Sequence, residues 1–393
     1  MSKVYHLPIQ FVMQGVERFV LSFIHTADVH LDAPLHMLAD RYELRQDDVR
    51  RTLQTIRDLV VSRQVDFWLI AGDLLEYHGG RRATAVFLRD LFESVAPIPV
   101  CIAPGNHDPW RADSFYQTMD WPGNVYWFTP EWGVYEFPEK SCVIYGWGFG
   151  QPHVYESPLA TFPGKLDGYR HHLMVLHGTI LNATKDEHQP YAPMSLQELV
   201  QADVDYVALG HIHKPEQFVH PLKKQPLAAY PGSPEGLTNK ETGERCVLHG
   251  ELDDAGKLTL QAIPVSQRQI HKWTIHAQGA ETAEQLIAGM EAQLGRIADR
   301  DLVYVTLTGE RAAHFVPSIP VLEQRFSRFF LFAITDETWP DIDAQKLMAE
   351  DSIWGKWLAK LAQIEANARS EEEREIARQA KQEALARIGG SMR

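Results

Sequence analysis

Short apolar runs alternate along this chain with longer stretches whose apolar residues fall at helical spacing. The run from Phe67 to Ala71 is too brief for a typical helix and ends in Gly72, which predicts a fully buried strand. Glu43 to Gln64 and Arg82 to Val95 have near-helical spacing instead. With further strands at Phe19–Ile24 and Ile98–Ile102, the pattern predicts a βαβαβ unit with right-handed connections and a parallel sheet covered on both faces.

The pattern changes between residues 124 and 150 to aromatic and β-branched segments separated by Gly and Pro. This texture predicts antiparallel structure that closes onto a second sheet. Strands are expected again at Leu173–Leu176 and Val204–Leu209, with a helix near Ser195–Gln201 between them. A hairpin from Cys246 to Val265 is expected to complete the first domain.

Four segments follow from this reading. We expect an N-terminal extension at 1–17, a main domain at 18–268, a small α/β capping domain at 269–340 and a helical segment at 341–393. The last segment carries an apolar stripe, and its two tryptophans are a large apolar load close to the end of the sequence. Packing on its own chain and docking of a partner are both open for that stripe, which consists of Ile353, Trp354, Trp357, Leu358, Leu361 and Ile364.

Composition narrows the class of protein. No apolar run approaches the roughly 18 residues of a membrane span, and Met1 to Glu17 lacks the pattern of a secretory leader. Three widely separated cysteines predict reduced thiols, so we expect a cytoplasmic protein without a membrane partner. The formal net charge of -14 argues against coating nucleic acid through bulk charge, but a carboxylate-rich metal site inside a nucleic-acid enzyme is compatible with it.

Polar side chains follow five of the expected strands, and these side chains are the candidates for metal binding and catalysis. In an open parallel sheet, ligands bind beyond the carboxyl ends of the strands, so we expect these side chains to meet there. Carboxylate, amide and imidazole groups without thiolate suit Mn, Fe or Zn. Seven candidate ligands exceed the needs of one ion and fit two ions that share a carboxylate, an arrangement suited to phosphate-ester hydrolysis. The candidates are Asp28, His30, Asp73, Asn106, His177, His211 and His213.

In this order, Asp28-X-His30, Gly72-Asp73, Gly105-Asn106-His107-Asp108, His177-Gly178 and Gly210-His211-Ile212-His213 resemble the calcineurin-like metallophosphoesterases. The resemblance spans roughly residues 19 to 233. It implies an α/β (α+β) fold, a two-layer mixed β-sandwich flanked by helices. It further implies that Asp28, His30, His213 and a bridging Asp73 hold one ion, whereas Asn106, His177, His211 and the same Asp73 hold the other. His107 would be catalytic beside the scissile phosphate, Asp108 would fix its orientation, and a metal-bound hydroxide would be the nucleophile.

Within that superfamily, the opening Ile24-His25-Thr26-Ala27-Asp28-Val29-His30-Leu31-Asp32 and the later Tyr230-Pro231-Gly232-Ser233-Pro234 resemble the SbcD-like DNA repair exonucleases. This implies a manganese-dependent DNA nuclease that works with a coiled-coil, SMC-like ATPase, with the Trp354/Trp357 stripe as the docking surface. A homodimer is also compatible with the sequence. One departure stands out: Leu74-Leu75-Glu76 replaces the aromatic residue followed by Asp or His that these relatives tend to carry. We expect it to leave the metal site untouched and to bear on substrate positioning and on exonuclease versus endonuclease cutting.

DNA contacts are predicted from charged and aromatic residues near the site loops. The cationic candidates are Arg81, Arg82, Arg111, Lys214, Lys223, Lys224, Lys240 and Arg245, and the stacking candidates are Tyr77, Trp110 and Tyr230. Two alternatives to a DNA exonuclease remain open at this point. One is a small-substrate phosphodiesterase or protein phosphatase on the same fold, and the other is a non-catalytic subunit of an ATPase complex.

Overall fold

The computed structural model describes residues 20–34, 41–76, 80–181, 190–341 and 344–391, so the predicted extension at 1–17 lies outside the described residues. The chain divides into two compact units. The first runs to Glu235 and includes Arg245–Gln267, and the second consists of Gly236–Glu244 and Arg268–Arg393. Sequence reasoning assigned 236–244 to the first domain, whereas these residues group with the second unit. The predicted segments 269–340 and 341–393 fall together in one unit.

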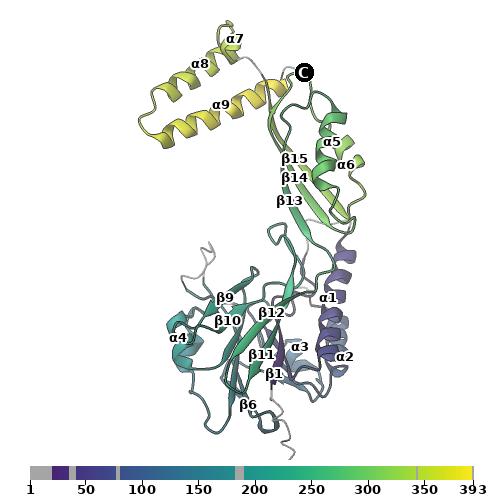
Figure 1. Cartoon of the computed structure of the whole chain (residues 1–393), viewed down its shortest axis with the longest axis vertical. Coiled ribbons are helices and arrows are strands. Elements are labelled where there is room, and N and C mark those ends of the chain that lie inside the picture. Colours follow the sequence, from purple (N-terminus) through teal and green to yellow (C-terminus); the bar gives the residue numbers. More distant parts are fainter. Residues whose placement is uncertain (1–19, 35–40, 77–79, 182–189, 342–343, 392–393) are drawn as a thin grey trace, which may run out of the picture. The chain divides into compact units, whose positions relative to one another are not determined.

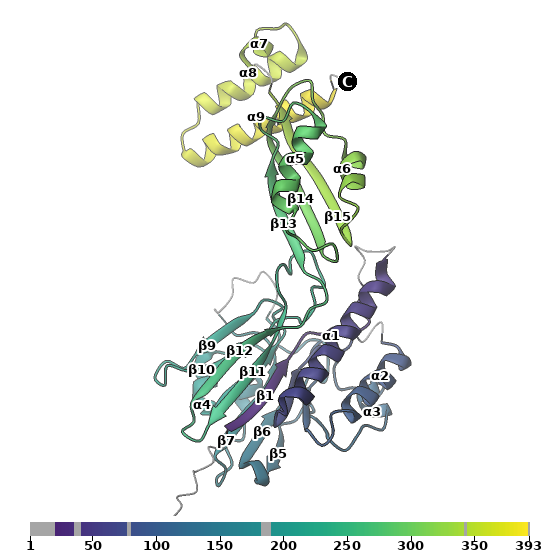
Figure 2. The same ribbon diagram turned by 45° about the vertical axis from the view of Figure 1, so that its right-hand side comes forward.

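The first unit begins with a six-stranded sheet in the order β12-β11-β1-β2-β3-β4. Its parallel part is β1 (Val20–Thr26), β2 (Phe67–Ala71), β3 (Val100–Ala103) and β4 (Val125–Trp127), to which the antiparallel hairpin β11 (Cys246–Asp253) and β12 (Leu258–Pro264) adds. The crossovers are α1 (Tyr42–Arg63) and α2 (Arg82–Glu93), and the short α3 (Phe115–Thr118) follows β3. Figures 1 and 2 show these helices together on one side of the sheet. The predicted βαβαβ unit is therefore confirmed.

The second sheet has the order β5-β6-β7-β8-β10-β9. It is antiparallel at both edges and parallel in its centre, and its strands are β5 (Gly133–Phe137), β6 (Cys142–Gly146), β7 (His171–His177), β8 (Tyr206–Gly210), β9 (Glu216–Val219) and β10 (Pro226–Tyr230). The prediction of antiparallel structure over 124–150 was right only for the β5/β6 pair, because β4 joins the first sheet in parallel. Short 3₁₀ turns at Pro138–Lys140 and Pro158–Thr161 connect this region, and α4 (Leu196–Ala202) starts from a capping box at Ser195.

The main core lies between the two sheets. Inward-facing residues of both sheets pack in one cluster, including Phe23, Leu69, Ile144, Val175 and Ala208, all with no exposed surface. A second cluster packs on the other face of the second sheet, where α4 contributes Leu199. Figure 1 shows α4 on that side, away from α1 and α2. The predicted two-layer mixed sandwich flanked by helices is confirmed.

The second unit is built on a fully parallel sheet of β13 (Ile270–His276), β14 (Leu302–Arg311) and β15 (Leu331–Pro340). The helices α5 (Ala283–Leu294) and α6 (Ile319–Arg325) cover one of its faces, as Figure 1 shows. Leu286 and Met290 of α5 pack there on Val303 and Val305. The alternating pattern over 270–335 therefore gives the strands and helices that the sequence predicts.

Three more helices follow in this unit: α7 (Ala344–Met348), α8 (Ile353–Ala366) and α9 (Glu371–Ser391). The apolar stripe on α8 divides between two environments. Leu358 packs with Leu347 and Ala384, and Trp354 lies against this cluster. Ile353 is 82% exposed and Ile364 is 48% exposed. Most described side chains of α9 are exposed, whereas Ala384 on one side of it is buried against α8. Within the described residues, no helix is long and apolar enough to cross a membrane.

Candidate metal centre

The seven candidate ligands all lie just beyond strand ends, but those strands belong to two sheets. Asp28, Asp73 and Asn106 follow β1, β2 and β3 of the first sheet. His177 ends β7 and His211 follows β8 of the second sheet. The sequence placed all five strands in one sheet, because a period-two pattern does not say which strands pair. The site therefore spans the carboxyl edges of both layers.

The backbone at these strand ends is held in an uncommon conformation. Asp28, His30 and Asp73 have φ values of 53°, 50° and 52°, in the left-handed region that non-glycine residues seldom adopt. Such strain gathers at functional sites, where the surrounding structure keeps it in place. Glycine makes the close approach possible: a Cβ at Gly210 would clash with the Ala71 carbonyl, and one at Gly72 would clash with the His177 ring.

Asp73 lies at the centre of the site. Its Oδ2 is 3.5 Å from His30 Nε2 and 3.3 Å from His177 Nε2, and its Oδ1 accepts a hydrogen bond of 2.9 Å from the His107 backbone N–H. One group of potential ligand atoms consists of Asp28, His30 and His213, and another consists of Asp73, His177 and His211; within each group the atoms lie within 4.8 Å of one another. Asp73 thus stands between two sets of donors, the position that a bridging carboxylate needs.

His177 shows that this arrangement suits a cation. Its Nδ1 donates a 2.9 Å hydrogen bond to the Ala71 carbonyl oxygen, which fixes the tautomer and leaves the Nε2 lone pair pointing into the site. Nε2 is 3.0 Å from Asn106 Oδ1, which is also 3.1 Å from His211 Nδ1. Three electron-rich atoms, His177 Nε2, Asn106 Oδ1 and Asp73 Oδ2, therefore converge. Burial opposes ionisation of His177, but the charge and hydrogen bond of Asp73 prevail and raise its pKa to about 9.

On the other side of Asp73, Asp28 gives the clearest indication of a cation site. It is fully buried; its Oδ1 accepts a 2.9 Å hydrogen bond from the His211 backbone N–H, whereas its Oδ2 has no hydrogen-bond partner among the described residues. A buried carboxylate oxygen without a donor is costly unless a cation compensates it. His30 Nε2 and His213 Nε2 face each other here at 3.1 Å. The donor set fits a divalent ion that accepts oxygen and imidazole ligands.

Arg245 was predicted as a DNA contact, but the structure places it inside the protein. It is 4% exposed, and its guanidinium donates to the His213 carbonyl oxygen, to the Ser233 carbonyl oxygen at 3.0 Å and to Ser233 Oγ at 2.7 Å. Arg245 therefore fixes the backbone of a candidate ligand. Tyr230, a predicted stacking residue, is likewise 1% exposed, and its hydroxyl donates to the Gly178 carbonyl.

The prediction that Asp108 orients His107 was wrong. The Asp108 carboxylate accepts hydrogen bonds from the backbone N–H groups of Asp73, Leu74, Leu75 and Gly105 and from the Tyr116 hydroxyl, at 2.5 to 3.1 Å. These five donors occupy the Asp108 carboxylate, and the side-chain contact to the His107 ring comes from Glu76 instead. Asp108 is thus a scaffold residue that fixes the loop carrying Asp73.

Glu76, rather than Asp108, is the carboxylate that contacts the His107 ring. Its two carboxylate oxygens are 3.0 and 3.1 Å from His107 Nδ1, and Oε2 is 3.4 Å from His30 Nδ1. The hydrogen bond that His107 makes to the Glu76 carboxylate raises the pKa of His107 to about 9. Burial raises the pKa of Glu76, but its hydrogen bonds with His107 and His30 outweigh burial and lower the pKa of Glu76 to about 2. The expectation that the change at Leu75-Glu76 leaves the metal site untouched was therefore wrong. The signal in the sequence was an acidic residue three positions after Asp73.

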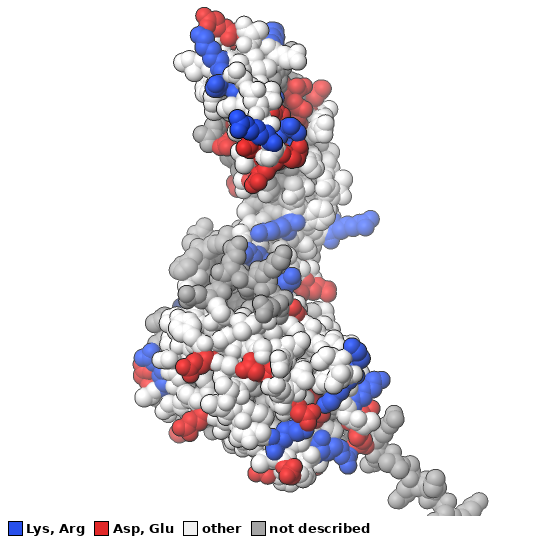
Figure 3. All heavy atoms as spheres, turned by 90° about the vertical axis from the view of Figure 1, so that its left-hand side faces the viewer, with Lys and Arg blue, Asp and Glu red and all other residues white. Residues whose placement is uncertain are grey.

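Several of the remaining predicted DNA contacts have partners within the protein. Tyr77 lies outside the described residues. Lys223 pairs with Asp203 at 3.3 Å, Arg111 pairs with Asp113 at 3.2 Å, and Trp110 lies beside Trp127. On the face that Figure 3 shows, described Lys and Arg residues are interspersed with Asp and Glu, and no broad field of one sign appears. The structure thus brings the seven candidate ligands together.

Comparison with known proteins agrees with this geometry. Residues 21–215 match the family model described as calcineurin-like phosphoesterase. A relative from Bacillus subtilis, "Uncharacterized metallophosphoesterase YhaO", is 30% identical over 57% of this chain and 56% of its own length. "DNA double-strand break repair protein Mre11" from Methanopyrus kandleri is 26% identical over 57% of this chain and 51% of its own length. This chain thus spans about half the length of the curated relatives it matches.

A solved structure, TT1561 of Thermus thermophilus, matches with a TM-score of 0.36 and 14% identity over 62% of this chain and 99% of that chain. The matched family range contains the two sandwich layers from β1 to β8 and all seven candidate ligands. Members of this family use a dinuclear metal site, and the candidate ligand groups lie where such a site requires them. Residues 21–215 are therefore a calcineurin-like phosphoesterase domain, and it is through this domain that the chain belongs to that family of metal-dependent phosphoesterases.

Proposed function

We propose that this protein is a two-metal phosphodiesterase that hydrolyses DNA, acting as the nuclease subunit of a DNA repair complex. The observation that carries the proposal is the shared Asp73, which has a buried, unsatisfied Asp28 oxygen on one side and the converging His177 and Asn106 atoms on the other. A pair of divalent cations there would supply Lewis acidity toward the phosphate and an activated water. Mn is the proposed metal, and Fe and Zn accept the same ligand types.

The chain's own residues divide the remaining work. His107 is the exposed member of the site, with 44% of its side chain accessible, whereas Asp28, Asp73 and His177 are buried. Glu76 holds His107 through Nδ1, which leaves Nε2 to face a bound phosphodiester. The hydrogen bond that His107 Nδ1 makes to the Glu76 carboxylate favours the protonated imidazole, which can donate to a phosphate oxygen or to the leaving oxygen.

DNA is proposed as the substrate on two grounds. Mre11 of M. kandleri, one of the two relatives reported above, is a DNA double-strand break repair protein by name. The exposed setting of His107 also leaves room for a polymer to pass the site. The described residues on the face in Figure 3 form no broad cationic surface, so we expect affinity to come from the metal centre and from scattered Lys and Arg residues.

The first test is hydrolysis of linear duplex DNA by the purified protein with Mn²⁺. We expect degradation by the wild type and a loss of about a thousandfold or more in His107→Ala, with metal content unchanged. His314→Ala, which alters an exposed histidine of the second unit, is the matched control and should retain full activity. Unchanged cleavage by His107→Ala would contradict the mechanism.

A panel of nucleotides and phosphopeptides separates this proposal from its alternatives. Turnover of a small phosphodiester or a phosphopeptide far above that of DNA would replace the DNA nuclease with one of those activities. Hydrolysis of none of these substrates with any divalent metal would favour a non-catalytic subunit.

A partner is proposed at the C-terminal helices. Exposed apolar side chains on α8 and α9, namely Ile353, Trp357, Ile364 and Ile376, offer a surface for a helical segment of a coiled-coil ATPase subunit. Replacement of Ile353 and Trp357 by Ser should abolish co-purification of such a subunit without changing nuclease activity of the isolated chain. Retention of the subunit would place its docking surface elsewhere.

A further inference from the structure

A pocket of about 360 Å³ lies beside the metal centre, and among the described residues that line it only Asp108 was a predicted site residue. Its walls come from the turn after β2 and from the segment leading into α3, and the lining residues are Leu75, Glu76, Gly80, Asp108, Asp113, Ser114, Phe115 and Tyr116. Its volume falls within the roughly 300 to 1,000 Å³ typical of small-molecule sites. The pocket is therefore large enough for a ligand rather than for a few waters.

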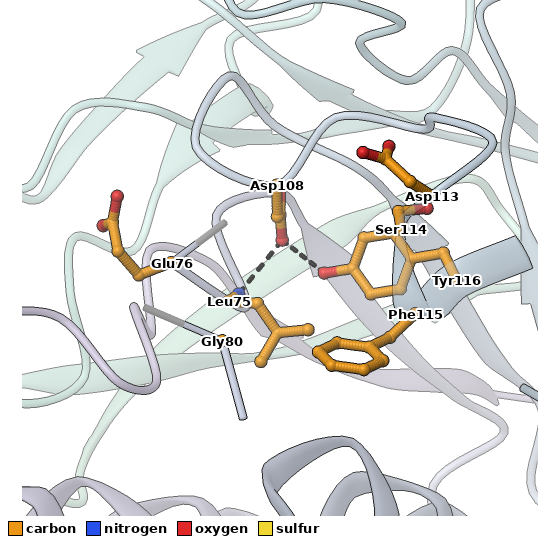
Figure 4. Close-up of a pocket in the computed structure, with 8 residues that line it drawn as sticks. All are labelled: Leu75, Glu76, Gly80, Asp108, Asp113, Ser114, Phe115 and Tyr116. Carbon is orange, nitrogen blue, oxygen red and sulfur yellow. Dashed lines mark hydrogen bonds between the residues drawn. The ribbon is translucent and has the colours of Figure 1, made fainter. Parts of the chain in front are cut away.

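The middle of the pocket is apolar. Figure 4 shows the Leu75 side chain and the Phe115 ring beside each other, with Glu76 and Gly80 on one side and Asp113 on the other. Leu75 is 4% exposed and Phe115 is half-buried. A Cβ added at Gly80 would lie 3.4 Å from the Phe115 ring. One buried aliphatic side chain and one accessible aromatic ring form a surface on which a flat, aromatic group can stack.

The polar groups of the pocket fall into two classes. Asp108 and the Tyr116 hydroxyl bond each other at 2.5 Å, and Asp108 also accepts the Leu75 N–H at 3.1 Å, as the dashed lines in Figure 4 show. These two groups serve the scaffold. Glu76, which faces His107, and Asp113, which pairs with Arg111 at 3.2 Å, stand at opposite sides. A carboxylate has about four lone-pair positions, so a ligand N–H can share these acceptors with the partners that they already have. Two carboxylates repel a phosphate and suit a neutral ring that carries N–H groups.

Glu76 also connects the pocket to the chemistry. It lines the pocket and at the same time holds His107 at 3.0 Å. A phosphodiester positioned at His107 therefore has an attached nucleoside within reach of the pocket. We propose that this pocket binds the nucleobase of the nucleotide next to the scissile phosphate, stacked on Phe115; this inference rests on the proposed phosphodiesterase function and names how its substrate is held.

Base binding in the pocket predicts a specific substrate preference. A neutral ring on Phe115 contributes binding energy that an abasic nucleotide lacks, and base–aromatic stacking alone accounts for about tenfold or more in affinity. Because every base has a flat face, the stacking part is tolerant of sequence. Amino-bearing bases gain the additional hydrogen bonds to Glu76 and Asp113.

The test compares two dinucleotides that differ only in whether the nucleotide next to the cleaved bond carries its base or is abasic. With Mn²⁺, the wild type should cleave the intact dinucleotide about tenfold more efficiently in kcat/KM. In Phe115→Ala this ratio should fall to about one, because only the intact substrate loses its stacking partner. Phe115→Tyr keeps a ring and should restore the wild-type ratio. Leu222→Ala, which truncates an 84% exposed residue elsewhere in the first unit, is the control.

Each outcome decides the matter. An intact-to-abasic ratio of one in the wild type, or a tenfold ratio that persists in Phe115→Ala, overturns the pocket assignment. An equal loss on both dinucleotides shows that Phe115 supports the fold alone, and thermal unfolding of Phe115→Ala will show the same. Failure to degrade duplex DNA, combined with a base-dependent ratio on the dinucleotides, refutes the DNA nuclease and leaves the base pocket standing. Cleavage of neither dinucleotide overturns the pocket assignment, and it refutes the phosphodiesterase as well when duplex DNA is not degraded either.

Discussion

Two buried carboxylates, Asp28 and Asp108, lie beyond the ends of β1 and β3 in the first sheet and have opposite environments. Both are 3% exposed or less. Asp108 accepts five hydrogen bonds from backbone N–H groups and the Tyr116 hydroxyl. Asp28 Oδ2 accepts none among the described residues and lies by His30 and His213.

The difference separates a group that holds the fold from a group that awaits a ligand. A carboxylate with its lone pairs filled by N–H donors stabilises the loop around it, and nothing remains for a cation to gain. A buried carboxylate with an open oxygen costs stability until a positive charge arrives. Burial and charge are the same at both positions, so hydrogen-bond satisfaction distinguishes them.

The largest expected effect comes from Asp28→Asn, because this change should move activity and stability in opposite directions. Loss of the carboxylate should lower DNA or dinucleotide hydrolysis about a thousandfold and reduce bound metal. In EDTA, the variant should be as stable as the wild type or more stable by about 1 kcal/mol, since an uncompensated buried charge is gone. Metal analysis and urea unfolding in EDTA measure both. A variant that unfolds more easily in EDTA would break the comparison.

Asp108→Asn should destabilise the folded protein by about 3 to 5 kcal/mol, with or without metal. An amide keeps one acceptor oxygen, and its NH₂ group would face N–H donors that need an acceptor. Urea unfolding checks this value. The contradicting result is a variant of wild-type stability that has lost metal, which would make Asp108 a ligand residue.

Glu76→Gln sharpens the comparison with an intermediate case, since Glu76 touches His30 and His107 while it is partly accessible. We expect kcat to fall about 10- to 100-fold, as for other groups that orient a ligand or a catalytic histidine, with KM and metal content close to wild type. Steady-state kinetics on one substrate and metal analysis separate these quantities. A large rise in KM at constant kcat would assign Glu76 to substrate binding alone.

His25 provides the smallest effect and a neutral counterpart to the carboxylates. Its Nδ1 lies 2.8 Å from the Tyr206 hydroxyl and its Nε2 lies 3.2 Å from the Leu209 carbonyl oxygen, so both nitrogens are satisfied. Burial lowers the pKa of His25 to about 3. Because the unfolded chain binds the proton first, stability should fall as pH drops from about 6.5 toward 3, by up to about 1.4 kcal/mol per pH unit.

His25→Leu should remove that part of the acid dependence, although it also loses two hydrogen bonds and starts from a lower stability at neutral pH. Urea unfolding between pH 4 and pH 7 compares the two slopes. Equal slopes would show that His25 takes up its proton in the folded protein.

Much of the fold was accessible from local pattern. The strand at Phe67–Ala71 and the helix at Tyr42–Arg63 follow from run length and periodicity, which act within a few residues. The parallel order β1-β2-β3 follows from short crossovers of one hand. The parallel pairing of β4 with β3 and of β6 with β7 did not follow, because a strand has the same local pattern whichever direction its neighbour runs.

The sequence by itself determined the candidate ligands: Asp, Asn and His at strand ends, three of which, Asp73, Asn106 and His211, directly follow a glycine. Only the tertiary structure decided which of them remain open to a ligand. In the folded protein, Asp108 accepts five hydrogen bonds, Asp28 Oδ2 has no hydrogen-bond partner among the described residues, and the Glu76 carboxylate contacts His107. The physical reason is that residue type and spacing set where a side chain begins. Its hydrogen-bond partners come from segments tens of residues away, and their positions depend on how two sheets pack face to face.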